Sequence, residues 1–306
     1  GTRRARRYPP VGEGRGALND GGAAEGVAGW WRFHYGLRMS ARRSLAASSI
    51  AWLLALAACA ELIQPVARVN LLGVEQEREI SAQFAAEVEA KQPVVRDAEV
   101  GGYVAELGGR LAGALREREF TYRFRAVEDP SVNAFNIGGG YVYVHTGLLA
   151  AADTEGQVAS VLAHEIGHQV ERHVAKAISR EQLFQTLAQV AVGPNASQWV
   201  QLGAGLGILT GQLHFGREAE RDADGVMVVL MTRAGYDPNE ALGMFEKLRA
   251  LDGRQPGKVA KLFSSHPPTG ERLEAVRKHI ARMSLPPDLV RDSQRFQEVR
   301  RRVKAG

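Results

Sequence analysis

Cysteine is nearly absent from this chain, because its 306 residues include only one, Cys59. A single cysteine excludes an internal disulfide framework and any zinc site built from cysteine ligands. Any metal site in the chain must therefore use other side chains.

Excess charge is also absent from most of the chain, although the formal net charge is +5. Nine of the 39 Lys and Arg residues, but only three of the 34 Asp and Glu residues, fall within residues 1–58, which leaves 30 basic against 31 acidic residues in the rest. Because the remaining body is nearly neutral, no nucleic-acid partner is expected. The 45% hydrophobic composition excludes a fully disordered chain and is enough for one large core or two small ones.

The apolar run near the start of the chain, Leu45–Ala58, is too short to favour a membrane span, which needs about 20 apolar residues. It follows Arg42 and Arg43 and ends in small residues, the plan of a secretory signal. The stretch Leu56-Ala57-Ala58-Cys59 resembles a bacterial lipobox, in which the cysteine is lipidated and becomes the mature N-terminus. An ordinary signal peptide and a short uncleaved anchor are the alternatives.

Composition divides the chain into five segments. Residues 1–38 are rich in Gly and Arg and lack periodicity, so we expect a disordered or non-native upstream extension, with Met39 as the true start. We then expect a lipoprotein signal peptide over 39–58, a tether over 59–72, one folded domain over 73–285 and a basic C-terminal helix over 286–306.

The chemistry centres on the stretch His164-Glu165-Ile166-Gly167-His168. Residues four apart share one face of an α-helix, so both imidazoles can reach a single metal ion, while Glu165 points toward the same ion without binding it. This arrangement suits zinc hydrolysis, in which a carboxylate takes the proton of a water molecule. The alternative is a helix whose His and Glu side chains merely face solvent. Thr154 and Gln157 predict the start of this helix through a capping box.

A zinc ion held by two histidines needs a third protein ligand. The metzincin extension is absent, since Glu171 and Val174 occupy the places of its Gly and His. His173 is predicted to point away from the other two histidines, as a surface or packing residue. The ligand is therefore expected from another helix, and the acidic cluster at 218–224 is the candidate source.

Two Glu-x-x-x-Asp pairs interleave in that cluster. Glu218 pairs with Asp222 and Glu220 with Asp224, and each pair lies on one face of a helix. Apolar residues flank both pairs, so periodicity does not separate them. His214, four residues before Glu218, is an alternative histidine ligand.

The rest of the domain is predicted to be mainly helical. Apolar residues recur at helical spacing over Glu75–Lys91 and Val100–Leu115, whereas Phe120–Val127 alternates as a half-buried strand does. A second strand, Tyr141–Val144, follows three glycines. It either pairs with an extended peptide or is purely structural.

These motifs, in this order, resemble the M48 family of zinc metallopeptidases, in the lipoprotein or periplasmic branch related to outer-membrane quality-control proteases. The resemblance covers roughly residues 70–280. The matching stretches are Asn133-Ala134-Phe135, residues 139–149, the His164–His168 motif, residues 220–224 and His266-Pro267-Pro268 with Arg272.

The resemblance implies a mainly α-helical (α+β) zincin-type domain with a small β-sheet, an active-site helix and a second ligand-bearing helix. It implies one Zn²⁺ per chain and Glu165 as general base, and it favours the second of the interleaved pairs. Asp224 would then orient His164, while His266 would either stabilise the oxyanion or occlude the metal. The alternative for His266 is that it caps the following helix or sits in a turn stiffened by Pro267 and Pro268. The implied metal ligands are His164, His168 and Glu220.

The expected function is that of a zinc metalloendopeptidase cleaving unfolded or misassembled envelope proteins. We expect it at the periplasmic face of the outer membrane, held by lipid on Cys59, with outer-membrane assembly machinery as a possible partner. A chaperone or assembly factor that uses the same groove with little cleavage is the alternative. A structural zinc site is disfavoured, because two His and one carboxylate leave a coordination position open.

Overall fold

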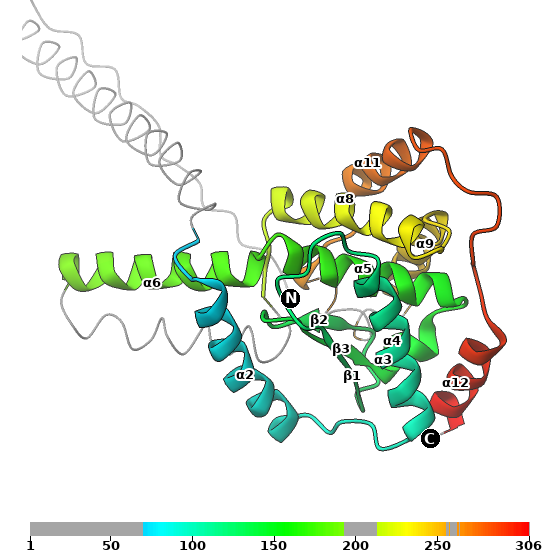
Figure 1. Ribbon diagram of the computed structural model, residues 1–306, viewed down its shortest axis with the longest axis horizontal. Helices are drawn as coiled ribbons and strands as arrows, with labels where there is room; N and C mark the ends of the chain where they lie inside the picture. The colour runs from blue at the N-terminus through cyan, green and yellow to red at the C-terminus, as the bar shows by residue number, and fades with distance from the viewer. Residues whose placement is uncertain (1–69, 193–212, 255–256, 258–261, 263, 306) are drawn as a thin grey trace, which may run out of the picture. The chain divides into compact units, whose positions relative to one another are not determined.

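Helices account for most of the described residues, and a small three-stranded sheet lies among them (Figure 1). The computed structural model describes residues 70–192, 213–254, 257, 262 and 264–305. The predicted fold class, mainly α with a small sheet, is confirmed. The expected leader, signal peptide and lipidated Cys59 lie outside the described residues. The helices are α2 (Val74–Lys91), α3 (Ala98–Gly113), α4 (Thr146–Ala151), α5 (Glu155–Val170), α6 (His173–Val192), α8 (Arg217–Arg233), α9 (Asn239–Arg254), α11 (Gly270–Ala281) and α12 (Gln294–Ala305).

The sheet has the strand order β1-β3-β2, with β1 at Arg123–Val127, β2 at Ala134–Asn136 and β3 at Tyr141–His145. β3 runs parallel to β1 and antiparallel to β2. Because β3 is paired on both sides, it has no free edge for an extended peptide, so the purely structural interpretation of Tyr141–Val144 is the correct one.

The turn between β2 and β3 requires glycine. Gly138, Gly139 and Gly140 all have positive φ angles, of 88°, 59° and 88°. A Cβ atom on Gly140 would also lie 2.6 Å from the carbonyl oxygen of Thr121. This tight turn returns the chain at once into β3, which leads through α4 to α5.

Helix α5 lies at the centre of the fold, with the sheet on one side and α8 on the other, and α11 lies beyond α8 (Figure 1). It begins as predicted, since the Thr154 hydroxyl accepts a hydrogen bond from the backbone N–H of Gln157. The predicted apolar face is fully buried at Val158, Leu162 and Ile166. The helix that carries the His-Glu motif is thus held by core packing on several sides.

A glycine in the motif explains how closely α5 and α8 approach. A Cβ atom added to Gly167 would lie 2.7 Å from the backbone oxygen and 2.9 Å from the Cα of Ala223. Both are backbone atoms, so nothing there can swing aside. Gly167 therefore allows α8 to bring its acidic residues against the histidines of α5.

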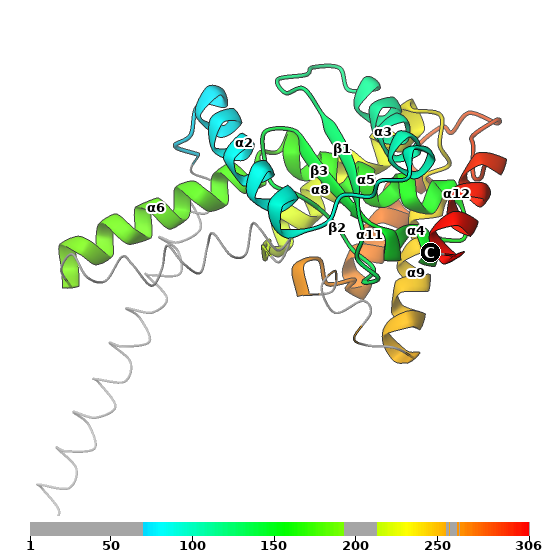
Figure 2. The same ribbon diagram turned by 90° about the horizontal axis from the view of Figure 1, so that it is seen from below.

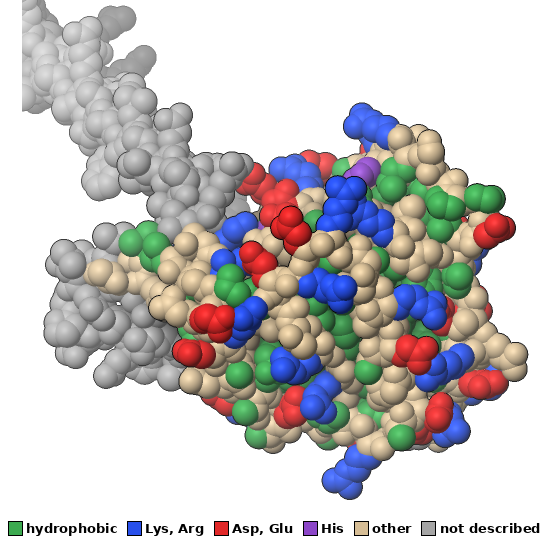
Figure 3. All heavy atoms as spheres, in the orientation of Figure 1, with side chains coloured by type: hydrophobic (Ala, Val, Ile, Leu, Met, Phe, Trp, Pro, Cys, Tyr) green, Lys and Arg blue, Asp and Glu red, His purple; other side chains and the backbone are tan. Residues whose placement is uncertain are grey.

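Two groups of helices lie at opposite ends of this centre. Figure 2 shows α2 and α6 at one end and α4 and α12 at the other. Helix α12 contributes Phe296 and Val299 to the same core as α5. The face drawn in Figure 3 mixes basic and acidic side chains, in keeping with a nearly neutral body. Among the described helices none is both long and apolar enough to cross a membrane.

Candidate metal centre

The two histidines of the motif face each other on α5, as the helical spacing predicts. The Nε2 atoms of His164 and His168 are 3.1 Å apart, and both side chains are buried. The ring of Phe215 stacks on His168 with centroids 4.2 Å apart. The pair is thus enclosed by protein rather than turned to solvent.

Glu220 of α8 lies against both histidines. Its carboxylate oxygens are each 3.4 Å from one Nε2 atom, Oε2 from that of His164 and Oε1 from that of His168. Glu220 is 2% exposed, whereas Glu218, in the alternative register, is exposed on the opposite side of the helix. Of the two interleaved pairs, the structure therefore brings the second to the histidines.

His266, from the turn before α11, completes the group. Its Nδ1 atom lies 2.8 Å from Glu220 Oε1 and 3.4 Å from His164 Nε2. One donor atom from each of His164, His168, Glu220 and His266 fits within 4.8 Å of all the others. Sequence reasoning left the place of His266 open, and the structure puts it directly among the predicted ligands.

The spacing of these donors fits a tetrahedral metal ion. For metal–ligand bonds of about 2.0–2.1 Å, as zinc makes to nitrogen, the ligand atoms of a tetrahedron are about 3.3 Å apart. Five separations within the group run from 2.8 to 3.4 Å, with both oxygens of Glu220 taking part, and the whole group fits within 4.8 Å. Three imidazoles and a carboxylate are also the donor types that zinc prefers. The residues present therefore fit a bound zinc ion.

Behind the donors lies an ion-paired layer. Asp224 Oδ1 is 3.0 Å from His164 Nδ1, on the side of the ring that faces away from the other donors. Arg272 binds both oxygens of Asp224, at 2.8 and 2.7 Å, and reaches Glu220 at 2.7 Å. This buried arginine pairs with both carboxylates and keeps them in place.

The same contacts shift the pKa values of these groups. Burial would lower the pKa of His164, but its contacts with Asp224 and Glu220 outweigh that effect and raise the pKa to about 9. Burial would raise the pKa of Asp224, but the hydrogen bonds of Arg272 and His164 lower it. The site therefore favours ionised carboxylates.

Glu165 lies beside the group, held from one side. Its Oε2 accepts hydrogen bonds from the backbone N–H of Asn136 at 3.1 Å and from the Asn136 side-chain amide at 3.3 Å. Its other oxygen, Oε1, makes no hydrogen bond to the described residues and lies 3.5 Å from His266 Nε2. One carboxylate oxygen is thus held by Asn136, and the other lies next to His266.

The sequence of the chain matches a known protein family. The family model described as "Peptidase family M48" matches residues 98–280, which is more than half of the chain and includes every residue of the group. The chain belongs to peptidase family M48.

Related proteins come from bacteria and from mitochondria. The M48 chain is 29% identical to the beta-barrel assembly-enhancing protease of Escherichia coli K12 over 237 residues, 74% of this chain and 48% of that protein. It is 29% identical to the protein of the same name from Yersinia pestis over 69% of this chain and 45% of the relative. It is 31% identical to the mitochondrial metalloendopeptidase OMA1 of Schizosaccharomyces pombe over 58% of this chain and 52% of the relative. The M48 chain spans about half the length of these relatives.

The predicted direction of His173 is wrong. Helical periodicity carried past the motif would point this side chain away, but α5 of the M48 domain ends at Val170 and α6 begins at His173 itself. Arg172 between them has a φ of 53°, which turns the chain sharply. His173 is consequently buried, with its Nδ1 2.9 Å from His168 Nδ1.

Sequence reasoning also missed Asn136. This residue directly follows the Asn-Ala-Phe stretch that carried the family resemblance and ends β2. A polar residue at the end of a strand, just before a glycine turn, is the signal that was available. Its contact with Glu165 spans 29 residues of sequence and has no periodicity to reveal it.

An apolar pocket opens beside the group. It reaches His164, Glu165 and His266. The apolar side chains around it include Val161, Met227, Ala241, Met244, Phe245 and Leu248. An apolar side chain bound there would lie next to Glu165.

Proposed function

We propose that this M48 chain is a zinc-dependent endopeptidase that cleaves unfolded or misassembled proteins of the cell envelope. The observation that carries the proposal is the buried carboxylate of Glu165, with one oxygen bound to Asn136 and the other making no hydrogen bond to the described residues, beside a donor set that fits zinc. A site that only binds metal has no need of such a carboxylate.

The ligands are proposed to be His164, His168 and Glu220. When bound, a zinc ion makes a water molecule acidic enough to attack a peptide carbonyl at neutral pH. Glu165 accepts the water's proton at Oε1 and then delivers it to the departing amine. Asn136 keeps that carboxylate oriented during both transfers, and Asp224 holds the proton of His164 on Nδ1, so that Nε2 stays free for the metal.

His266 is proposed to close the resting site. Its Nδ1 lies 2.8 Å from Glu220 and 3.4 Å from His164, so His266 would serve as a fourth donor and would leave a four-coordinate zinc ion no position for water or substrate. Cleavage then requires His266 to leave. His266 is followed by Pro267 and Pro268, which stiffen the turn, so its departure would involve the turn as a whole.

The fourth donor also favours a different function, a purely structural zinc site, because closed four-ligand sites are usually structural. A chaperone that binds clients without cutting them is the third candidate. Neither of these two functions requires a carboxylate that lies beside the metal without binding it. The discriminating variant is therefore Glu165→Gln, which removes the base and keeps the shape.

The test uses the purified chain with an unfolded protein as substrate and zinc measured on the same samples. We expect about one zinc per chain in the unmodified chain and in Glu165→Gln. Cleavage by the variant should be slower by about 10²–10⁴-fold, as for the loss of a general base. A chelator should abolish cleavage by the unmodified chain. Equal cleavage by the variant and the unmodified chain would overturn the proposal.

The envelope location and the partners are proposed on two further grounds. The bacterial relatives are named beta-barrel assembly-enhancing proteases, and the Leu56–Cys59 stretch resembles a lipobox. We infer a lipid anchor at Cys59, attachment to the periplasmic face of the outer membrane, and substrates drawn from outer-membrane protein assembly.

A further inference from the structure

One proposed ligand, His168, contacts a buried histidine that is not in the donor group, His173. The ring nitrogen of His168 that faces away from the metal group, Nδ1, lies 2.9 Å from Nδ1 of His173. Both rings are buried, and Phe215 lies against both, with its ring centroid 4.2 Å from that of His168 and 5.8 Å from that of His173. His173 therefore occupies, for His168, the place that Asp224 occupies for His164.

The fold holds His173 there through a strained turn. Arg172 has a φ of 53°, a left-handed backbone conformation that residues other than glycine rarely adopt. Its guanidinium donates to Glu77 Oε2 at 2.7 Å and to the carbonyl of Leu72 at 2.8 Å. Glu77 is fully buried and also accepts a hydrogen bond from Gln169 at 2.9 Å. Helix α2 thus fixes the turn that places His173.

The hydrogen bond between two imidazoles determines where the protons lie. To bind a metal through Nε2 as a neutral ring, His168 must carry its proton on Nδ1 and donate it to His173. His173 must then accept at Nδ1 and carry its own proton on Nε2. That nitrogen faces Asp222, whose Oδ2 is 4.0 Å away.

The same residues raise a competing possibility, because one donor atom each from Glu171, His173 and Asp222 also fits within 4.8 Å of the others. A second cation on His173 Nε2 would, however, force the proton of His173 onto Nδ1, where it faces the proton of His168. The metal-binding tautomer of His168 and a cation on His173 therefore exclude each other.

We propose that His173 is a positioning residue that fixes the tautomer and ring orientation of His168 for metal binding. The inference rests on the proposed zinc site, in which His168 is a ligand. It assigns different supports to the two motif histidines, a carboxylate behind His164 and a neutral imidazole behind His168.

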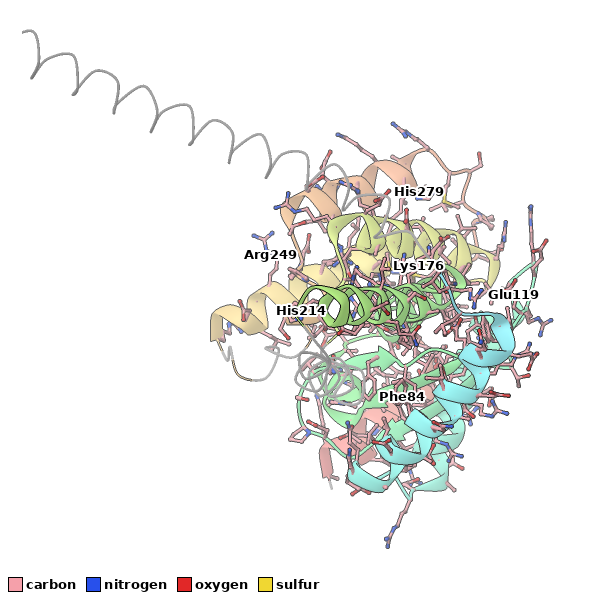
Figure 4. All side chains as sticks on the ribbon, turned by 90° about the vertical axis from the view of Figure 1, so that its left-hand side faces the viewer. Phe84, Glu119, Lys176, His214, Arg249 and His279 are labelled. Atoms are coloured by element: carbon pink, nitrogen blue, oxygen red, sulfur yellow. The ribbon has the colours of Figure 1, made fainter. Side chains whose placement is uncertain are left out.

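The test compares two replacements of His173 by their zinc affinity in competition with a chelator. His173→Leu removes the acceptor, and we expect zinc to bind about 10–100-fold more weakly, as for other lost hydrogen bonds behind a ligand. His173→Asn keeps an oxygen near the position of Nδ1 and should restore most of that loss. His279→Leu, on α11 and labelled at the top of Figure 4, is the matched control and should leave zinc affinity unchanged.

A second measurement needs no variant, so it holds even if His173→Leu does not fold. Long-range ¹H–¹⁵N spectra of the zinc-loaded chain should show His168 protonated at Nδ1 and His173 protonated at Nε2. The reverse protonation of His173, or unchanged zinc affinity in a folded His173→Leu variant, would overturn the proposal. So would a second zinc equivalent that both His173→Leu and Asp222→Asn remove. Failure of the unmodified chain to bind any zinc would instead reject the proposed function.

Discussion

Glu218 and Glu220 differ by two positions, yet only Glu220 lies against the histidines of the motif. A shift of two residues on a helix turns a side chain by about 200°, so Glu220 faces the histidines while Glu218 faces solvent. Glu220→Gln should weaken zinc binding sharply and abolish cleavage. Glu218→Gln is the matched control and should be nearly silent, as surface substitutions usually are. Metal analysis showing zinc lost from the Glu218 variant and kept by the Glu220 variant would reverse the assignment.

His266 allows a prediction with opposite outcomes for two roles. If its imidazole closes the fourth corner of the donor set, His266→Ala opens that corner to water, and cleavage of an unfolded protein should rise several-fold while zinc is retained. If it stabilises the oxyanion instead, cleavage should fall by about 10²–10³-fold. The donor distances of 2.8 and 3.4 Å favour the first outcome. Initial rates at equal zinc content separate the two.

Among the elements, the α5–α8 contact determines whether the site can assemble. Gly167→Ala places a methyl group against the backbone of Ala223, so the helices must separate. Overpacking of this kind costs about 1–3 kcal/mol. We expect a lower melting temperature and weaker zinc binding, because Glu220 and Asp224 would retreat from the histidines.

The matched control for that variant is Gly225→Ala on α8. A Cβ atom there meets nothing within 4 Å, and alanine favours helix over glycine by up to about 1 kcal/mol. Its melting temperature should stay the same or rise. Equal zinc affinity in Gly167→Ala and the unmodified chain would show that the close helix contact does not support the site.

At the level of the elements, the sequence predicted the features that depend on neighbouring residues. The buried face of α5, its Thr154 cap and the spacing of His164 and His168 all follow from helical geometry, and the structure has each of them. His173 could not be placed in this way, because its position depends on Glu77, which lies 95 residues before Arg172. Periodicity likewise could not choose between Glu218 and Glu220, since both pairs are helical faces, and the choice came from the family resemblance.

At the scale of the whole molecule, the lipid anchor stays a prediction that chemistry can test. Cys59 is the single cysteine of the chain, so a modified thiol can be assigned without ambiguity. In the native host, the mature protein should begin at Cys59 and carry several acyl chains, since one chain holds a protein only weakly. Cys59→Ser should release it from membranes or block its processing. Mass spectrometry showing an unmodified Cys59 would contradict this.

Metal and fold should also be coupled across the whole domain. The proposed ligands come from α5 and α8, and His266 adds a donor from the turn before α11, so a bound ion would join segments far apart in the sequence. Zinc at about 1,000 times its Kd stabilises a folded chain by about 4 kcal/mol. For a domain of roughly this size, each kcal/mol raises the melting temperature by about 2–4 °C. Chelation should therefore lower it by about 8–16 °C.

The size of that shift should depend on pH in a defined direction. The pKa of His164, raised to about 9 by Asp224 and Glu220 against the effect of burial, means that zinc must displace a proton from this ring below pH 9. Each pH unit below that value should weaken zinc binding about tenfold, or about 1.4 kcal/mol. The stability of the zinc-free chain has the opposite pH dependence. Protonated His164 stabilises that chain fully below pH 6.5, and the stabilisation is lost as pH rises toward 9. The gap between the zinc-loaded and chelated melting temperatures should therefore widen steadily from pH 6.5 to 9 at fixed free zinc. A gap that stays constant over that range would show that His164 does not hold the proton that the metal replaces.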